Sequence, residues 1–126
     1  MGVFVTAFVV AVLGAPLWAQ DPARIQVRTA TITDGLFVLT GAGAHIGVSV
    51  GEDGVLLVDD GMVPASQQVK AAVTALDARP PRIVLNTNWH YDHADGNEAM
   101  ALQGATVIAH RLSRPHMLAE QRITEL

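Results

Sequence analysis

The chain has 126 residues, of which half are hydrophobic and 16% are charged, and its formal net charge is −4 at pH 7. This length allows one domain at most, and the composition excludes a disordered chain, which would be poorer in hydrophobic residues and richer in charge. The acidic balance excludes a basic nucleic-acid footprint, and the lack of cysteine excludes both a disulfide framework and a thiolate zinc site.

The first 19 residues differ from the rest because none of them is charged. The run Val3–Leu13 is apolar enough for the core of a secretory signal peptide, and Ala19 is a small residue at a possible cleavage site. We therefore expect a signal peptide at residues 1–19, a mature domain at residues 20–126, and export to the periplasm or the extracellular space. No Lys or Arg precedes the run, which leaves an uncleaved membrane anchor as the alternative. Such an anchor needs about 20 apolar residues, and this run is shorter.

Apolar segments separated by Gly-containing turns predict strands in the first half of the chain. The predicted strands are Arg24–Ile32, Leu36–Thr40, Ile46–Val50 and Val55–Val58. The last of these is a continuous apolar run, which is typical of a strand covered on both faces.

The hydrophobic period changes after Gly61. Apolar residues at i, i+3, i+4 and i+7 from Val69 to Leu76 predict a helix that begins near Pro64 and ends before Pro80. Further strands are predicted at Arg82–Asn86 and Ala105–Ala109, and further helices at Glu98–Leu102 and after Pro115. This order predicts an α/β domain in which helices cover one face of a sheet, and another layer must cover the other face.

The residues that can carry chemistry gather in the polar loop Thr87–Asn97. His90, Asp92 and His93 lie within four positions, and imidazole and carboxylate are the usual zinc ligands where thiolates are absent. In an extended segment Asn88, His90 and Asp92 form one row, from which His93 turns away. Taken alone, these residues also fit a polar loop that binds nothing.

This loop resembles the histidine motif H-x-H-x-D-H of the metallo-β-lactamase superfamily. The resemblance continues on both sides of the loop, because Thr40–Gly61 is similar to the family's opening hairpin and its strand ending in Asp, and Ala105–His110 is similar to the next strand. It implies the N-terminal half of an αββα sandwich, an α+β arrangement with a mixed sheet and flanking helices, so that residues 20–126 would be a truncated domain with a bare inner sheet face. It also implies a zinc-dependent hydrolase that attacks a carbonyl in a small-molecule ester, amide, thioester or β-lactam.

The resemblance assigns roles to individual residues. It implies that His90 binds a first zinc ion and that Asp92 and His93 bind a second one. Asp92 would also be catalytic, because it would orient the attacking water. Asp59, at the end of its strand, would support the metal loop, with a simple turn residue as the alternative. The remaining histidines are not expected to be ligands; they are His45 in the Gly-rich loop, His110 at a strand end and His116 on a predicted helix.

Two departures from the family pattern affect activity. Asn88 occupies the position where the family usually has His, and an amide oxygen is a poor zinc ligand, although one mono-zinc subclass of β-lactamases also has Asn there. The other family ligands would lie downstream of Leu126, and the sequence stops at Leu126 within a predicted helix. We therefore expect a fragment that binds zinc weakly or not at all and is inactive alone. The rival hypothesis is a degenerate, non-catalytic exported module that binds a partner through its open sheet face; a metal carrier has too few ligands.

Overall fold

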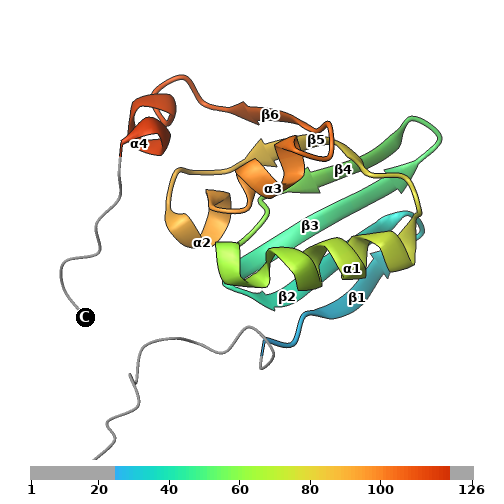
Figure 1. Cartoon of the computed structure of the whole chain (residues 1–126). Coiled ribbons are helices and arrows are strands. Elements are labelled where there is room, and N and C mark those ends of the chain that lie inside the picture. The colour runs from blue at the N-terminus through green and yellow to red at the C-terminus, as the bar shows by residue number, and fades with distance from the viewer. Residues whose placement is uncertain (1–24, 120–126) are drawn as a thin grey trace, which may run out of the picture.

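The computed structural model describes residues 25–119, so both ends of the chain, including the predicted signal peptide, lie outside the described residues. Six strands form one sheet in the order β1-β2-β3-β4-β5-β6 (Figure 1). The strands are β1 (Arg28–Thr33), β2 (Leu36–Ala42), β3 (Ala44–Gly51), β4 (Gly54–Val58), β5 (Pro81–Asn86) and β6 (Thr106–Ala109). The helices are a single 3-10 turn (Val63–Ala65), α1 (Ser66–Leu76), α2 (Tyr91–Ala94), α3 (Asn97–Ala101) and α4 (Arg114–Leu118).

The sheet is mixed. Strands β1 to β4 are antiparallel neighbours joined by short turns, whereas β4, β5 and β6 run parallel. Parallel neighbours need a crossover connection, and α1 supplies it between β4 and β5 while α2 and α3 supply it between β5 and β6. This arrangement confirms the predicted α/β class with a mixed sheet and flanking helices.

One face of the sheet packs against the helices and forms the core. The register pairs Val48 with Leu57 and Leu57 with Val84, so these side chains share a face. Val69 of α1 and Met100 of α3 pack against the same layer, and none of the five is more than 1% exposed. Figure 1 accordingly shows α1 and α3 on the same side of the sheet. Burying each such side chain stabilises the fold by about 1.5–3 kcal/mol, and this layer fixes the strands that carry the loop.

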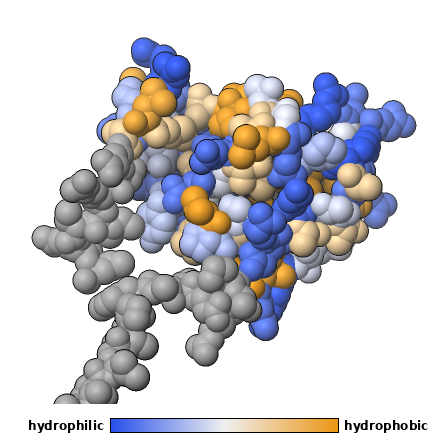
Figure 2. Space-filling model, viewed as in Figure 1, coloured by the Kyte–Doolittle hydropathy of each residue, from blue (hydrophilic) through white to orange (hydrophobic). Residues whose placement is uncertain are grey.

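The other face of the sheet is largely exposed within residues 25–119. The register places Val58, Leu85 and Ile108 in one row across β4, β5 and β6, and Leu85 and Ile108 are 41% and 45% exposed. Strand β4 is therefore covered on one face among the described residues, and not on both as its continuous apolar run predicted. The helix-covered side, seen in Figure 2, carries only small hydrophobic patches among hydrophilic side chains.

Several element boundaries differ from the sequence prediction. Strand β1 begins at Arg28, where pairing with Thr40 starts, and not at Arg24, which lies outside the described residues. His45 belongs to β3 and not to a loop, because the turn at Gly43 is tight enough for Ala42 to pair with Ala44. The one-turn helix α2 lies within the predicted loop. Within residues 25–119, every helix is too short or too polar to cross a membrane.

Candidate metal centre

The polar loop follows β5, and Asp59 follows the neighbouring parallel strand β4. Because the two strands run in the same direction, their ends meet at one edge of the sheet. The Asp59 N–H extends this pairing by donating to the Leu85 carbonyl oxygen over 3.0 Å. The fold thus places Asp59 directly beside the start of the loop.

The Asp59 carboxylate is 3% exposed and holds the loop through three contacts. Its Oδ1 accepts the Thr87 N–H and its Oδ2 accepts the Thr87 hydroxyl, both over 2.8 Å. Its Oδ2 also lies 2.8 Å from Nδ1 of His93. Asp59 reaches these partners from a left-handed backbone conformation, with φ at 63°. Its side chain therefore links the end of β4 to both ends of the segment that contains the histidine motif.

These contacts determine which nitrogen of His93 can bind a metal. An ionised Asp59 carboxylate can only accept a hydrogen bond, so Nδ1–H of His93 is then the donor, and the lone pair of a neutral ring lies on Nε2. His93 Nε2 lies 3.6 Å from Oδ2 of Asp92. Zinc bonds to nitrogen and carboxylate oxygen are about 2.0–2.2 Å long, so two atoms at this separation can bind the same ion. Asp92 and His93 therefore fit a shared metal.

The side chain of Asn88 forms hydrogen bonds within the loop. Its Oδ1 accepts the His90 N–H over 2.8 Å, and its Nδ2 donates to the Thr87 hydroxyl over 3.2 Å. An Asn side chain that bonds the backbone two residues ahead shapes a turn. If Asn88 took the place of a histidine ligand, its Oδ1 would be the atom that binds the metal. The hydrogen bond that Oδ1 accepts from the His90 N–H therefore competes with metal binding.

His90 is not grouped with the other two predicted ligands. Its side chain is exposed, and its ring lies against Trp89 with 4.5 Å between the ring centroids. Across residues 25–119, no three side chains among His, Cys, Asp and Glu converge as a metal site. The structure thus brings Asp92 and His93 together and places Asp59 against His93, while metal binding by His90, Asp92 and His93 stays a prediction.

The other histidines lie elsewhere. His45 is exposed on β3, and His110 accepts the Leu112 N–H at Nδ1 over 3.3 Å. His116 of α4 stacks on Trp89, with 4.5 Å between centroids and 17° between ring planes. The aromatic ring of Trp89 therefore contacts both His90 and His116.

Asp60, which no sequence motif singles out, lies beside the loop. Asp60 is fully buried, and neither of its carboxylate oxygens has a hydrogen-bond partner among the described residues. Burial raises the pKa of Asp60 to about 7; the nearby Gly96 N–H lowers it in part, and the charges of Asp59 and Asp95 raise it further. The Gly96 N–H donates its hydrogen bond to the Gly61 carbonyl oxygen over 3.0 Å, so it stabilises the ionised Asp60 carboxylate only weakly. In the sequence, the only feature that pointed to Asp60 was its place beside Asp59 and before Gly61.

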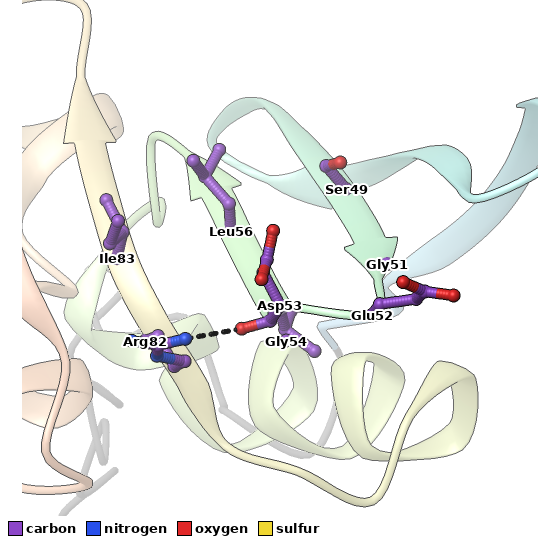
Figure 3. Close-up of a pocket in the computed structure, with 9 residues that line it drawn as sticks. Ser49, Gly51, Glu52, Asp53, Gly54, Leu56, Arg82 and Ile83 are labelled. Atoms are coloured by element: carbon purple, nitrogen blue, oxygen red, sulfur yellow. Dashed lines mark hydrogen bonds between the residues drawn. The ribbon is translucent and has the colours of Figure 1, made fainter.

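A hollow of about 390 Å³ lies away from this centre (Figure 3). Its lining includes the turn between β3 and β4, from Gly51 to Gly54, and the beginning of β5, where Arg82 donates to the Asp53 carbonyl oxygen over 2.7 Å. These residues lie at the opposite ends of β4 and β5 from Asp59 and the loop. The hollow therefore contains none of the predicted site residues.

Three solved structures that are similar to this chain are each much longer than it. A metallo-β-lactamase of Cronobacter sakazakii with a HARLDQ motif is 24% identical with a TM-score of 0.64, and the match covers 71% of this chain and 36% of that one. MEM-A1, a subclass B3 enzyme from a soil metagenome library, is 20% identical with a TM-score of 0.68, and the match covers 82% and 40%. A B3 enzyme described as the first with an active-site glutamic acid is 29% identical with a TM-score of 0.63, and the match covers 69% and 34%.

The chain thus spans well under half of the length of these solved relatives. No curated protein sequence matches it significantly. The sequence profile of the metallo-β-lactamase superfamily matches residues 39–122, which include β4, Asp59 and the whole loop. On this match over more than half of its residues, and on the shared fold, the chain belongs to the metallo-β-lactamase superfamily.

Proposed function

We propose that this chain is the N-terminal part of a zinc-dependent hydrolase and that Asp92 and His93 hold the metal. The observation that carries this proposal is the arrangement of Asp59, His93 and Asp92. Asp59 bonds Nδ1 of His93 over 2.8 Å, and Nε2 of the same ring faces the Asp92 carboxylate at 3.6 Å. Carboxylates that bond the second nitrogen of a metal-binding histidine are typical of zinc enzymes, where they fix the tautomer and raise the basicity of the ligand.

The chemistry that zinc supplies when bound is polarisation of the carbonyl group and a water molecule of lowered pKa. The residues of this chain have separate tasks. Asp59 keeps the Nδ1 proton on His93, and the Thr87 N–H anchors the Asp59 carboxylate in turn. Asp92 has a second carboxylate oxygen, Oδ1, that can accept a hydrogen bond from the attacking water and orient it.

The described residues supply fewer ligands than a catalytic zinc needs. Such an ion usually has three protein ligands and one open position, and here two side chains converge. We propose that the missing ligands come from the part of the family fold that this chain does not span. That part would also cover the row of Val58, Leu85 and Ile108, in which Leu85 and Ile108 are exposed.

The proposed substrate is a small molecule with an ester, amide, thioester or β-lactam carbonyl, and no nucleic acid or stable membrane anchor is proposed. A β-lactam is the first to test, because the solved relatives are named as metallo-β-lactamases. A shared fold does not fix the substrate, so the assay must include a thioester as well. Export to the periplasm or outside the cell is proposed from the apolar run Val3–Leu13.

The test compares this chain with the protein isolated from its native source. We expect an intact mass well above the 13.3 kDa of the chain and zinc-dependent turnover by the native protein. We expect negligible turnover by the 126-residue chain. Robust zinc-dependent turnover by the purified chain would contradict its proposed incompleteness.

A native protein with the mass of this chain, or of the chain without residues 1–19, would favour a second candidate function. This is a non-catalytic exported module that binds a partner through its open sheet face. The exposed apolar side chains Leu85 and Ile108 favour that candidate.

A further inference from the structure

Gly43, in the turn between β2 and β3, lies against the candidate metal loop. It has a positive φ of 107°, and a Cβ atom built on it would lie 3.1 Å from the carbonyl oxygen and 3.2 Å from Cβ of Asp92. The same Cβ would lie 2.8 Å from Cγ of Met62. The turn therefore lies so close to Asp92 that an added side chain would contact Asp92 more tightly than Cβ atoms normally contact their neighbours.

The turn cannot easily withdraw from Asp92. The Met62 N–H donates to the carbonyl oxygen of Ala42, the residue before Gly43, over 2.9 Å. Ala42 is itself fully buried. A side chain at position 43 would therefore be accommodated by movement of Met62 or Asp92.

Movement of Asp92 would change its relation to His93. Asp59 holds the His93 ring through Nδ1 and comes from β4, so the ring is not free to follow Asp92. The 3.6 Å separation between Asp92 Oδ2 and His93 Nε2 thus depends on contacts from two sides. Asp59 fixes the histidine, and Gly43 limits where the aspartate can lie.

We propose that Gly43 is a positioning residue, whose lack of a side chain places the Asp92 carboxylate for joint metal binding with His93. This inference rests on the proposed function, because it assumes that these two residues hold the metal. It adds to that function a residue outside the histidine motif, 49 positions before Asp92 in the sequence.

Backbone strain must be separated from the contact with Asp92. An alanine at a φ near 100° is strained wherever it lies, by about 1–3 kcal/mol. Gly104 provides the matched control, because its φ is 97° and nothing lies within 4 Å of a Cβ built on it. Gly43→Ala and Gly104→Ala therefore share the strain, and only the first meets Asp92.

The experiment measures both variants beside the wild type. In the metal-free chain, NMR records the ¹³C shift of the Asp92 carboxyl group and the ¹⁵N shifts of the His93 ring. Chelator competition then measures the zinc affinity of the native, full-length protein and of the same variants made in it. Gly43→Ala should shift the Asp92 signal and lower zinc affinity by about 10-fold to 100-fold, the range seen when a supporting partner of a metal ligand is lost. Gly104→Ala should lower the Tm without either effect.

Equal Asp92 shifts and equal zinc affinities in the two variants would overturn the proposal. If the native, full-length wild type bound no zinc, the proposed function would fail, while the metal-free NMR comparison would still decide whether Gly43 places Asp92. If Gly43→Ala failed to fold, the double variant Gly43→Ala/Met62→Ala would replace it. That variant removes the 2.8 Å contact with Met62 Cγ and keeps both contacts with Asp92, so it should recover stability but not zinc affinity.

Discussion

Oδ2 of Asp59 lies 2.8 Å from Nδ1 of His93, across 34 positions of sequence. The two residues meet because β4 and β5 are parallel neighbours whose ends share one edge of the sheet. The orientation of the imidazole is therefore set by the sheet and not by the loop alone, and this makes the loop sensitive to changes at the end of β4.

Asp59→Ala should destabilise the fold by about 3 kcal/mol, because it leaves the Thr87 N–H without its charged acceptor and removes the partner of His93. Urea unfolding measures the loss. The matched control is Asp53→Ala in the exposed turn between β3 and β4, which should change stability by less than about 0.5 kcal/mol. Similar losses in both variants would show that the Asp59 contacts contribute little.

Asp60 should make stability fall as pH rises. Its pKa in the folded state is about 7 and its ordinary value is 3.8, so between these values the folded state keeps a proton that the unfolded state has released. The folded state thus loses stability from about pH 4 to pH 7, by up to about 4 kcal/mol, and does not regain it at higher pH. Asp60→Asn should remove this dependence.

Urea unfolding at several pH values tests the role of Asp60. The difference in unfolding free energy between wild type and Asp60→Asn should shift in favour of the variant as pH rises. Parallel curves for the two proteins would mean that the Asp60 carboxyl group titrates as in water.

Asn88→His should strengthen zinc binding in the native, full-length protein. Imidazole is a better zinc ligand than an amide oxygen, and position 88 is the first position of the histidine motif. Asn88→Ala is the control, since it loses the same contacts to Thr87 and His90 without gaining a ligand. A metal competition titration that finds the affinity of Asn88→His unchanged would argue against the placement of residue 88 beside the metal.

Gly96→Ala should destabilise the junction between α2 and α3. The φ of Gly96 is −72°, so alanine brings no backbone strain, but its Cβ would lie 2.6 Å from the carbonyl oxygen and 2.9 Å from Cγ of Asp60. Forcing an extra methyl group into a packed site reduces stability by about 1–3 kcal/mol. Gly51→Ala is the control, because a Cβ there meets nothing within 4 Å. Thermal unfolding should give a lower Tm for Gly96→Ala than for Gly51→Ala. Equal Tm values would show that the loop moves to accommodate the methyl group at no cost in stability.

The sequence predicted those elements whose pattern is local. The period from Val69 to Leu76 appears as α1, and the alternation in Ile46–Val50 appears within β3. Helix α2 was missed because it depends on the His90 carbonyl oxygen, which accepts the N–H groups of both His93 and Ala94, and not on a hydrophobic period.

Tertiary contacts account for the parts of the site that no spacing could predict. The motif brought His90, Asp92 and His93 to attention together, but the ring of His90 lies against Trp89. The burial of Asp60 arises only when the end of β4 packs beneath the loop, where the Asp60 N–H donates to the His93 carbonyl oxygen over 2.9 Å.

The central claim is that Asp92 and His93 form one metal-binding pair with Asp59 behind it. Zinc titration of the native, full-length protein, followed through the ¹⁵N signals of the histidine rings, tests it most directly. Zinc should shift Nε2 of His93 while Nδ1 stays protonated, and His93→Gln or Asp92→Asn should weaken the binding. Zinc binding that leaves His93 unchanged and shifts another histidine, or no zinc binding by the native protein, would contradict the account.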